Sequence, residues 1–542
     1  MNKSYEFILA GAERITKSVL QNIITDEQSP DYGGVDLPEP GIIHDKSSII
    51  PEPLLCYFNE NSKYCRESAV LDAVSAMLDF ALARLHDDNT WDLYTCNMRS
   101  SPDTAFGTIT LAKMYRIASR HAETEPEKRI CEKLRHLIDK CSAGIAAGGF
   151  HTPNHRWVVS AALALSRNII KNEELLPVIE SYLAEGIDCN EDGEFAERSA
   201  GGYNYINQYA MFILAEELGR PEYNNYALRN LRMMKAYFEP DMTVFTGNST
   251  RQDYGKKIFA DKYYPMYLYG ACRLSEPGFA AIAGKIINEC MTGTRPAPEC
   301  LDYLMLYPDM AEVDCRGSVD FTCDRFFNDS GIVRIIEEGM SITLLRGNAD
   351  FLHVRMKELS LFMRMNISFF NERHLIADEI VKTDEGYTLK YKGYGKYYLP
   401  YGSYQGTSDW WRMDRSKRPI TKNMDITIDV HISRTDDGID LSFESAGCTG
   451  APVRLEINIA DAVRVEHDAF SMPWKPGAGM VVKNGSLCAR TGFESITIGP
   501  CFATHHYIDN LFGSVPQSDG HMRFYLTEMT GFQRKLSICF NK

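Results

Sequence analysis

Several motifs that would assign a protein to a common class are missing from this sequence. Its 542 residues contain no GxGxxG turn, P-loop, HExxH motif or GxSxG elbow. They also contain no run of about 18 apolar residues, the length of a membrane-spanning helix. The sequence therefore predicts neither a nucleotide-dependent enzyme of the common types, nor a zincin, nor a transmembrane protein.

Cysteine pairing and a signal peptide are not indicated either. The 15 cysteines are odd in number and show no CxxC or zinc-finger spacing, which favours a reducing compartment. Glu6, Glu13, Arg14 and Lys17 interrupt the first residues, where a signal peptide would have an apolar core. These features predict a cytoplasmic protein.

Positive charge is scarce, since 58 Lys and Arg face 73 Asp and Glu for a net charge of −15. Such an acidic chain is not expected to bind nucleic acid or an anionic membrane. It would also repel a long polyanion, so an acidic substrate needs a local basic cleft, and short oligosaccharides fit better. The 29 Tyr and 26 Phe suit a sugar-binding cleft, although large β-sandwich cores use aromatic residues as well.

Apolar periodicity divides the chain into a helical part and a strand-rich part. Helices are expected at residues 67–85, 103–122, 126–146, 156–170, 173–184, 203–218, 221–237, 256–273 and 278–291. Strands are expected at residues 331–345, 361–370, 426–432, 438–443, 453–459, 495–498 and 522–528. The helical hairpins are expected to stack as a bundle, a solenoid or a closed α/α toroid, and the strands as an antiparallel sandwich. The expected domains are residues 1–305 and 306–542.

The most informative motif is Asn154-His155-Arg156, which follows a Gly pair and Pro153 at the start of an expected helix. Amide, imidazole and guanidinium donors in one place can hold a carboxylate, which points to chemistry on an acidic sugar. The alternative is structural, with Asn154 as a helix cap and His155 exposed in the first turn.

Four more polar clusters are candidates, each with a structural alternative such as a buried Tyr, a solvated turn or a packing loop. In the cluster of residues 192–209, Tyr205 and Tyr209 share a helix face. In the cluster of residues 351–360, His353 and Arg355 lie two positions apart on an expected strand and so share one of its faces. The clusters are residues 192–209, residues 248–255 with Arg251 and Tyr254, residues 351–360, and the loop with Tyr404, Trp410, Trp411 and Arg412.

In this order the clusters resemble the heparinase II/III-like polysaccharide lyases and the related alginate and oligoalginate lyases. The resemblance implies a multidomain α + β chain, with an α/α toroid (an incomplete barrel of helical hairpins) followed by an antiparallel β-sandwich. It implies that Asn154-His155 neutralise the uronate carboxylate. It also implies that a DG…EG-x-x-Y-x-x-x-Y stretch supplies the catalytic Tyr. Here Tyr205 is the match, and Tyr203 competes because residues 198–202 replace the usual Glu-Gly-Pro.

The family's first strands carry a His-x-His-x-Asp-like stretch followed by Leu-Ser, and His353 and Leu359-Ser360 match its ends. Arg355 and Lys357 stand in place of the second His and the Asp, so the zinc site of some members is in doubt. No cofactor is expected to be required, and Ca²⁺ or Zn²⁺ is neither required nor excluded.

The implied reaction is β-elimination from a uronate. Asn154, His155 and an Arg would offset the carboxylate charge while an enolate forms. A base then takes the C5 proton and an acid protonates the leaving O4 oxygen. Tyr205 is assigned as the acid, or as acid and base, and His353 as base or carboxylate partner because histidine titrates near neutrality. The substrate-binding candidates are Arg99, Arg156, Tyr203, Arg251, Tyr254, Arg355, Trp410 and Arg412.

Three alternatives stay open. A glycoside hydrolase would need two facing carboxylates, with Asp103, Asp192, Glu194, Glu197, Asp253 and Glu358 as candidates. A uronate C5-epimerase would share the proton abstraction but reprotonate carbon. A non-catalytic carbohydrate-binding protein would use the same loops without turnover. The sequence leaves open whether the chain forms a homo-oligomer.

Overall fold

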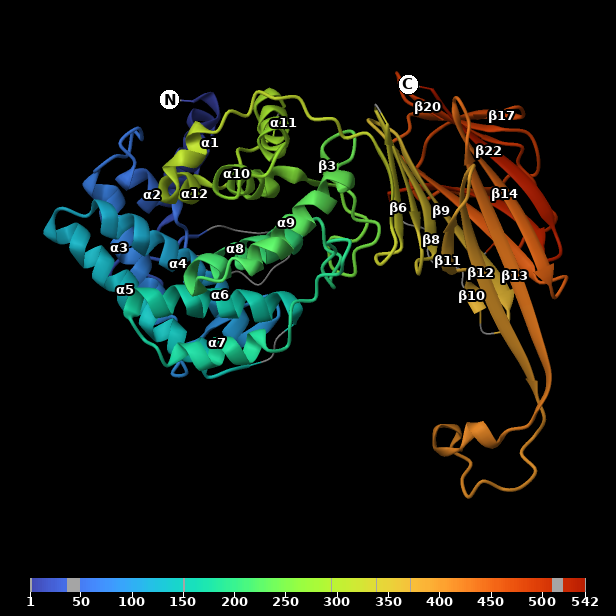
Figure 1. Cartoon of the computed structure of the whole chain (residues 1–542), viewed down its shortest axis with the longest axis horizontal. Coiled ribbons are helices and arrows are strands. Elements are labelled where there is room, and N and C mark those ends of the chain that lie inside the picture. The colour runs from blue at the N-terminus through green and yellow to red at the C-terminus, as the bar shows by residue number, and fades with distance from the viewer. Residues whose placement is uncertain are drawn as a thin grey trace. The chain divides into compact units, whose positions relative to one another are not determined.

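The computed structural model describes residues 2–36, 49–149, 152–293, 295–337, 339–370, 372–508 and 520–541. The chain forms two compact units, one of residues 1–238 and 242–320 and one of residues 239–241 and 321–542. Figure 1 shows helices in the first unit and strands in the second. The division lies at 320/321, whereas the sequence placed it at 305/306, because the last helical turns still belong to the first unit.

The first unit is built from helices with three short 3-10 turns and two small hairpins. Its α-helices are α1 (Lys3–Asn22), α2 (Glu52–Phe58), α3 (Ser68–Ala83), α4 (Ser101–His121), α5 (Glu125–Ala146), α6 (Pro153–Ile170), α7 (Leu175–Leu183), α8 (Asn204–Leu218), α9 (Glu222–Met234), α10 (Tyr264–Arg273), α11 (Phe279–Thr292) and α12 (Leu301–Leu306). The shorter elements are β1 (Trp91–Leu93), β2 (Asn97–Ser100), η1 (Lys235–Tyr237), β3 (Thr243–Val244), β4 (Ile258–Phe259), η2 (Ala260–Tyr263) and η3 (Pro308–Glu312).

These helices alternate between an inner and an outer layer. α4, α6, α8 and α10 pack against one another in succession, and α5, α7, α9 and α11 each pack on the inner helix before them. α2 and α12 contact each other and α4. The expected α/α toroid of helical hairpins is confirmed.

Helix α6 shows how the sequence produces an inner helix. Pro153 occupies its first turn, where the missing N–H costs nothing, and Lys171 ends it in a left-handed conformation. Trp157 and almost every residue up to Ser166 are buried, since neighbours surround the helix. The side chains at its start are therefore held in fixed positions.

The helix expected over residues 256–273 is wrong in its first half. Ile258 and Phe259 form β4, which pairs with Val244 and Thr243, and α10 begins only after a 3-10 turn. Gly255 precedes this stretch with a φ of +68°, a turn conformation that favours glycine and prevents a helix from starting there.

The second unit is a sandwich of two nine-stranded sheets, in the orders β18-β21-β15-β9-β8-β7-β6-β5, with β10 beside β9, and β11-β12-β13-β14-β22-β20-β19-β16-β17. Its strands are β5 (Cys323–Phe327), β6 (Ile332–Glu337), β7 (Met340–Leu345), β8 (Asp350–Met356), β9 (Ser360–Phe369), β10 (Glu372–His374), β11 (Ala377–Lys382), β12 (Gly386–Tyr398), β13 (Ile420–Arg434), β14 (Gly438–Gly447), β15 (Pro452–Ala460), β16 (Arg464–His467), β17 (Phe470–Pro473), β18 (Gly479–Val481), β19 (Leu487–Arg490), β20 (Ser495–Gly499), β21 (Met522–Met529) and β22 (Gln533–Asn541). One apolar core includes strands of both sheets, from Val333 to Phe540.

Apart from the parallel pair β18–β21, the ladders between these described strands are antiparallel, so the expected antiparallel sandwich is confirmed. The strand expected over residues 331–345 is two strands, β6 and β7, which pair with each other. The long ladder between β12 and β13 closes through a loop of residues 399–419, which carries the short turns η4 (Trp410–Arg412) and η5 (Arg415–Lys417).

Candidate functional site

The first unit brings two polar loops together. Asp253, which is buried, accepts hydrogen bonds from the hydroxyls of Ser199 at 2.8 Å and Ser249 at 2.6 Å. It also accepts one from the backbone N–H of Gly201 at 2.9 Å. These bonds join residues that lie about 50 positions apart, so the clusters at 192–209 and 248–255 form one surface.

The same loops are joined a second time through Glu197. The backbone carbonyl of Glu197 accepts hydrogen bonds from the Thr250 hydroxyl at 2.9 Å and the Thr250 backbone N–H at 3.3 Å. The backbone at Arg198 is left-handed, with a φ of +50°, which a residue with a Cβ adopts only when its surroundings hold it there. The loop that carries Glu197 is therefore fixed by contacts on both sides.

Two buried residues, Asn154 and Glu197, and the partly exposed Arg251 contribute polar groups to this surface. Within the described part of the chain, Asn154 Nδ2 and Arg251 Nε have no hydrogen-bond partner. Asn154 is 0% and Glu197 6% exposed. Arg251 Nε and Glu197 Oε1 form an ion pair at 3.7 Å, longer than a hydrogen bond. Because an unsatisfied buried polar group costs about 1–3 kcal/mol, such a group of them is typical of a binding site.

The carboxyl of Glu197 has an altered acidity. Burial raises its pKa, while the Arg251 guanidinium and the backbone N–H of Asn154 lower it and Asp253 raises it further. Burial outweighs the cation, so the pKa lies above the usual range for a glutamate. The Asn154 backbone contact also connects the start of α6 with the two loops.

Two tyrosine hydroxyls lie beside cations. The Tyr203 hydroxyl accepts a hydrogen bond from Arg251 Nη2 at 3.4 Å, and the guanidinium lies 4.8 Å from the centre of its ring. The Tyr205 hydroxyl accepts one from Lys262 Nζ at 3.1 Å, with the ammonium 4.9 Å from the ring. Tyr203 also donates to Gln252 at 3.4 Å. Of the two tyrosines, Tyr203 shares Arg251 with Glu197.

The remaining residues of the α6 start are placed differently. The His155 ring stacks edge-on against Phe106, with centroids 6.3 Å apart. Arg156 is buried and forms ion pairs with Glu185 at 3.1 Å and Asp188 at 2.7 Å, so its charge is used within the protein. Phe150 and His151 of the same motif lie outside the described residues.

Arg99 and Tyr254, two further candidates, are both exposed. Arg99 pairs with Asp87 and Asp88, and its side chain is exposed. Tyr254 is 44% exposed in the loop that contains Arg251. Tyr209 faces the same side of α8 as Tyr205, with ring centroids 6.4 Å apart, and burial raises its pKa well above the usual value.

In the second unit, His353 and Arg355 lie on one face of β8, as expected. Burial lowers the pKa of His353 to about 4, so its imidazole is neutral at pH 7 and does not offer a positive charge to a carboxylate. Arg355 pairs with Asp241 at 2.7 Å and Asp461 at 3.4 Å. Trp410 and Arg412 lie in the loop between β12 and β13.

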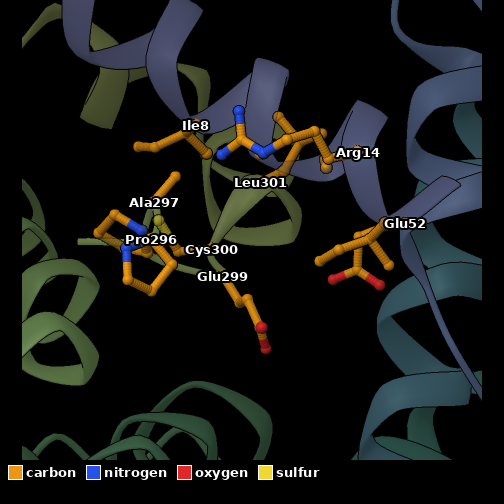
Figure 2. A pocket seen from close by; sticks show the side chains of 12 residues that line it. Ile8, Arg14, Glu52, Pro296, Ala297, Glu299, Cys300 and Leu301 are labelled. Atoms are coloured by element: carbon orange, nitrogen blue, oxygen red, sulfur yellow. The ribbon is translucent and has the colours of Figure 1, made fainter. Parts of the chain in front are cut away.

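A small pocket of about 150 Å³ lies in the first unit between α1, the start of α2 and the connector before α12. Figure 2 shows Arg14, Glu52 and Glu299 among its lining side chains. Burial raises the pKa of Glu52 to about 7, and the charges of Glu299 and Asp302 add to the effect. Glu299 also contributes to the raised pKa of Lys262, so this pocket is electrostatically linked to the cation beside Tyr205.

The sequence did not indicate Lys262 as a site residue, and it placed Gln252 in a candidate cluster without giving it a role of its own. Lys262 fell inside a segment expected to be helical, and a surface lysine there carries no signal of its own. In the described ranges no three His, Cys, Asp or Glu side chains are arranged to hold a metal ion. None of the described helices is long and apolar enough to cross a membrane.

No protein-family model matches this sequence, and no curated protein matches it. Solved structures do match. A Paenibacillus xanthan lyase aligns with a TM-score of 0.55 at 11% identity, covering 100% of this chain and 58% of that one. Heparinase III aligns with a TM-score of 0.53 at 10% identity, covering 100% and 84%. A Streptomyces coelicolor chondroitin AC lyase, solved with chondroitin sulphate, aligns with a TM-score of 0.51 at 10% identity, covering 99% and 79%.

These identities establish the fold and nothing finer. The chain has the polysaccharide lyase fold, an α/α toroid followed by a β-sandwich, and the resemblance seen in the sequence is confirmed at that level. The chain spans only 58% of the xanthan lyase.

Proposed function

We propose that this protein is a lyase that cleaves uronic-acid-containing oligosaccharides by β-elimination. The observation that carries this function is two buried donor atoms, Asn154 Nδ2 at the start of α6 and Arg251 Nε in the loop of residues 248–255, which have no hydrogen-bond partner within the described residues. A uronate carboxylate would satisfy both. The polysaccharide lyase fold supports the same conclusion.

The carboxylate must be neutralised before the C5 proton can leave. Asn154 and Arg251 donate to the two carboxylate oxygens, and His155 adds a third donor from the next position of α6. Negative charge that builds on the enolate is then held by donors already in place, which is worth about 3–4 kcal/mol per donor in comparable sites. Arg156 is not assigned to the substrate, because Glu185 and Asp188 engage it.

A tyrosine completes the reaction. Its hydroxyl protonates the O4 oxygen as the C4–O4 bond breaks, and a base receives the C5 proton, so one proton enters and one leaves. Tyr203 shares Arg251 with the carboxylate site, whereas Tyr205 contacts Lys262. We therefore assign the acid to Tyr203 and keep Tyr205, the choice favoured by the sequence, as its competitor. His353 stays a candidate base, in keeping with its neutral imidazole, and protein groups alone carry the reaction.

A glycoside hydrolase is a second candidate, because Glu197 and Asp253 are both buried in this cluster and the charge of Asp253 raises the pKa of Glu197. Asp253, however, already accepts three hydrogen bonds from its own loops. Only Glu197 is available to act on a substrate, and a hydrolase needs a pair.

The experiment compares Tyr203→Phe and Tyr205→Phe in the absorbance assay for unsaturated uronates. Loss of general acid catalysis predicts a fall in kcat/KM of about 10²–10⁴-fold for the catalytic residue. Tyr226→Phe is the matched control, since Arg229 lies 5.5 Å from its ring outside the site. Full activity in both site variants would contradict the tyrosine assignment. His353→Ala tests the base, and EDTA is expected to leave the rate unchanged.

A further inference from the structure

The strand pair β12–β13 extends beyond the rest of its sheet. In the described chain, β11 pairs with β12 only as far as Tyr391, and β14 pairs with β13 only as far as Ile426. β12 and β13 continue to pair with each other out to Tyr398 and Ile420. Residues 392–425, this two-stranded ribbon and its closing loop, are called the arm, and Figure 1 shows it past the labelled ends of β12 and β13.

The arm exposes an unusual amount of aromatic surface. Tyr397 and Tyr398 are neighbours on one strand and so lie on opposite faces of the ribbon, which leaves aromatic rings on both sides. A two-stranded ribbon alone is only marginally stable in water, and an exposed apolar patch of this kind marks an interaction site. The aromatic side chains that are 43–80% exposed are Tyr394, Tyr397, Tyr398, Tyr404, Trp410 and Trp411.

The arm is also basic, although the chain is acidic. It holds seven Lys and Arg and three Asp, a net charge of +4, in a chain of net charge −15, so the remaining residues carry −19. Arg415 lies 5.6 Å from the Trp411 ring, and Arg418 lies 4.9 Å from the Tyr398 ring. Trp, Tyr and Arg are the residue types that dominate binding energy at protein–protein interfaces.

We propose that the arm is an interface between two copies of this chain, in which the basic aromatic arm of one copy lies on an acidic surface of the other. Charge favours this occupant, since each copy offers both the +4 arm and the −19 remainder. Area favours it as well. At about 200 Å² per aromatic side chain, covering the exposed fractions removes roughly 700 Å² per arm. Two arms give roughly 1,400 Å², the size of a standard specific interface. An acidic glycan stacking on one aromatic face would leave the other face uncovered.

The test is the mass of the full chain in solution, measured by light scattering across micromolar concentrations. The wild type is expected at twice 61.4 kDa. Replacing residues 397–422 by Asn-Gly, a turn that fits the paired positions Lys396 and Asn423, is expected to give a monomer. The double variant Tyr404→Ser/Trp411→Ser is expected to raise the dimer dissociation constant at least tenfold without affecting folding, since both side chains are 80% exposed. Phe493→Ser, which changes another exposed aromatic of the same unit, is the control and should remain dimeric.

Several results would overturn this interface. One is a wild type that stays a monomer at every concentration, and another is a shortened variant that remains a dimer. A third is a monomeric wild type that binds chondroitin sulfate oligosaccharides and loses this binding when the arm is shortened. That result would make the arm a glycan site. Trypsin gives an independent readout, because cleavage after Arg412 and Arg415 should slow as protein concentration rises and dimers form. A cleavage rate independent of concentration would count against the dimer.

Discussion

At the scale of single residues, the candidate site is marked by buried polar atoms that have no hydrogen-bond partner among the described residues. Asn154 and Glu197 come from segments about 40 positions apart, yet the main-chain N–H of Asn154 acts on the Glu197 carboxyl. In the proposed function, Glu197 lies beside the substrate carboxylate, where its ionised form repels that group and its protonated form donates to it. A raised pKa keeps it protonated further toward neutral pH.

The pH dependence of substrate binding follows from Glu197. As pH rises, Glu197 ionises next to Arg251 and Asp253 and places a negative charge beside the substrate carboxylate, so KM is expected to rise. Glu197→Gln keeps the shape and the neutral charge, so its KM should stay flat over the same pH range. Steady-state KM of wild type and variant between pH 5 and 9 checks this. An identical pH profile in the two proteins would remove Glu197 from the site.

At the scale of elements, Asp253 holds the two site loops together by accepting hydrogen bonds from both. Asp253→Asn turns one acceptor oxygen into a donor, which faces either the two serine hydroxyls that bond to Oδ1 or the Gly201 N–H that bonds to Oδ2. We expect a loss of about 1–3 kcal/mol in the free energy of unfolding and a lower kcat/KM. Hydrogen exchange of residues 197–203 should speed up in the variant. Asp309→Asn, at an exposed ion pair with Arg273, is the control. Unchanged hydrogen exchange in both variants would contradict the role of Asp253 in holding the two loops together.

Burial of the Glu52 carboxyl in helix α2 lowers the free energy of unfolding at high pH. The pKa of Glu52 rises from 4.5 unfolded to about 7 folded, so its stabilising contribution is complete below about pH 4.5 and is lost as pH rises through 7. Glu52→Gln removes this loss. It should therefore be more stable than wild type above pH 8, by up to about 3 kcal/mol, and equal to it near pH 4. Thermal unfolding across pH checks the sign, with the exposed Glu60→Gln as control.

Sequence periodicity predicted the elements that bury one continuous face and missed those that depend on distant partners. The inner helices were predicted because apolar residues recur along α4, α6 and α8. The pairing of Ile258 with Val244 was missed, since it depends on a strand that the local pattern does not show. The site followed the same rule. Asn154, Tyr203 and Arg251 were identified by residue type, but Lys262 and the role of Asp253 emerge only when loops 50 positions apart meet.

For the whole molecule, net charge is expected to influence how the proposed substrates approach. A chain at −15 repels a long polyanion more than a short oligosaccharide, because more of the polymer lies in the protein's field. Added NaCl screens this repulsion beyond about 10 Å at 0.1 M. KM for a long uronate polymer should therefore fall as salt rises, while KM for a tetrasaccharide changes little. A KM for the polymer that rises with salt would show that local basic groups dominate instead.

The most direct test of the central claim is to measure new double bonds and new reducing ends in the same digest of uronate oligosaccharides. β-Elimination produces one unsaturated uronate for each bond cleaved, so the two quantities should rise together in a ratio of one. Hydrolysis produces reducing ends without any unsaturated uronate. A flat absorbance trace beside accumulating reducing ends would contradict the lyase and direct attention to Glu197 as a hydrolytic carboxylate.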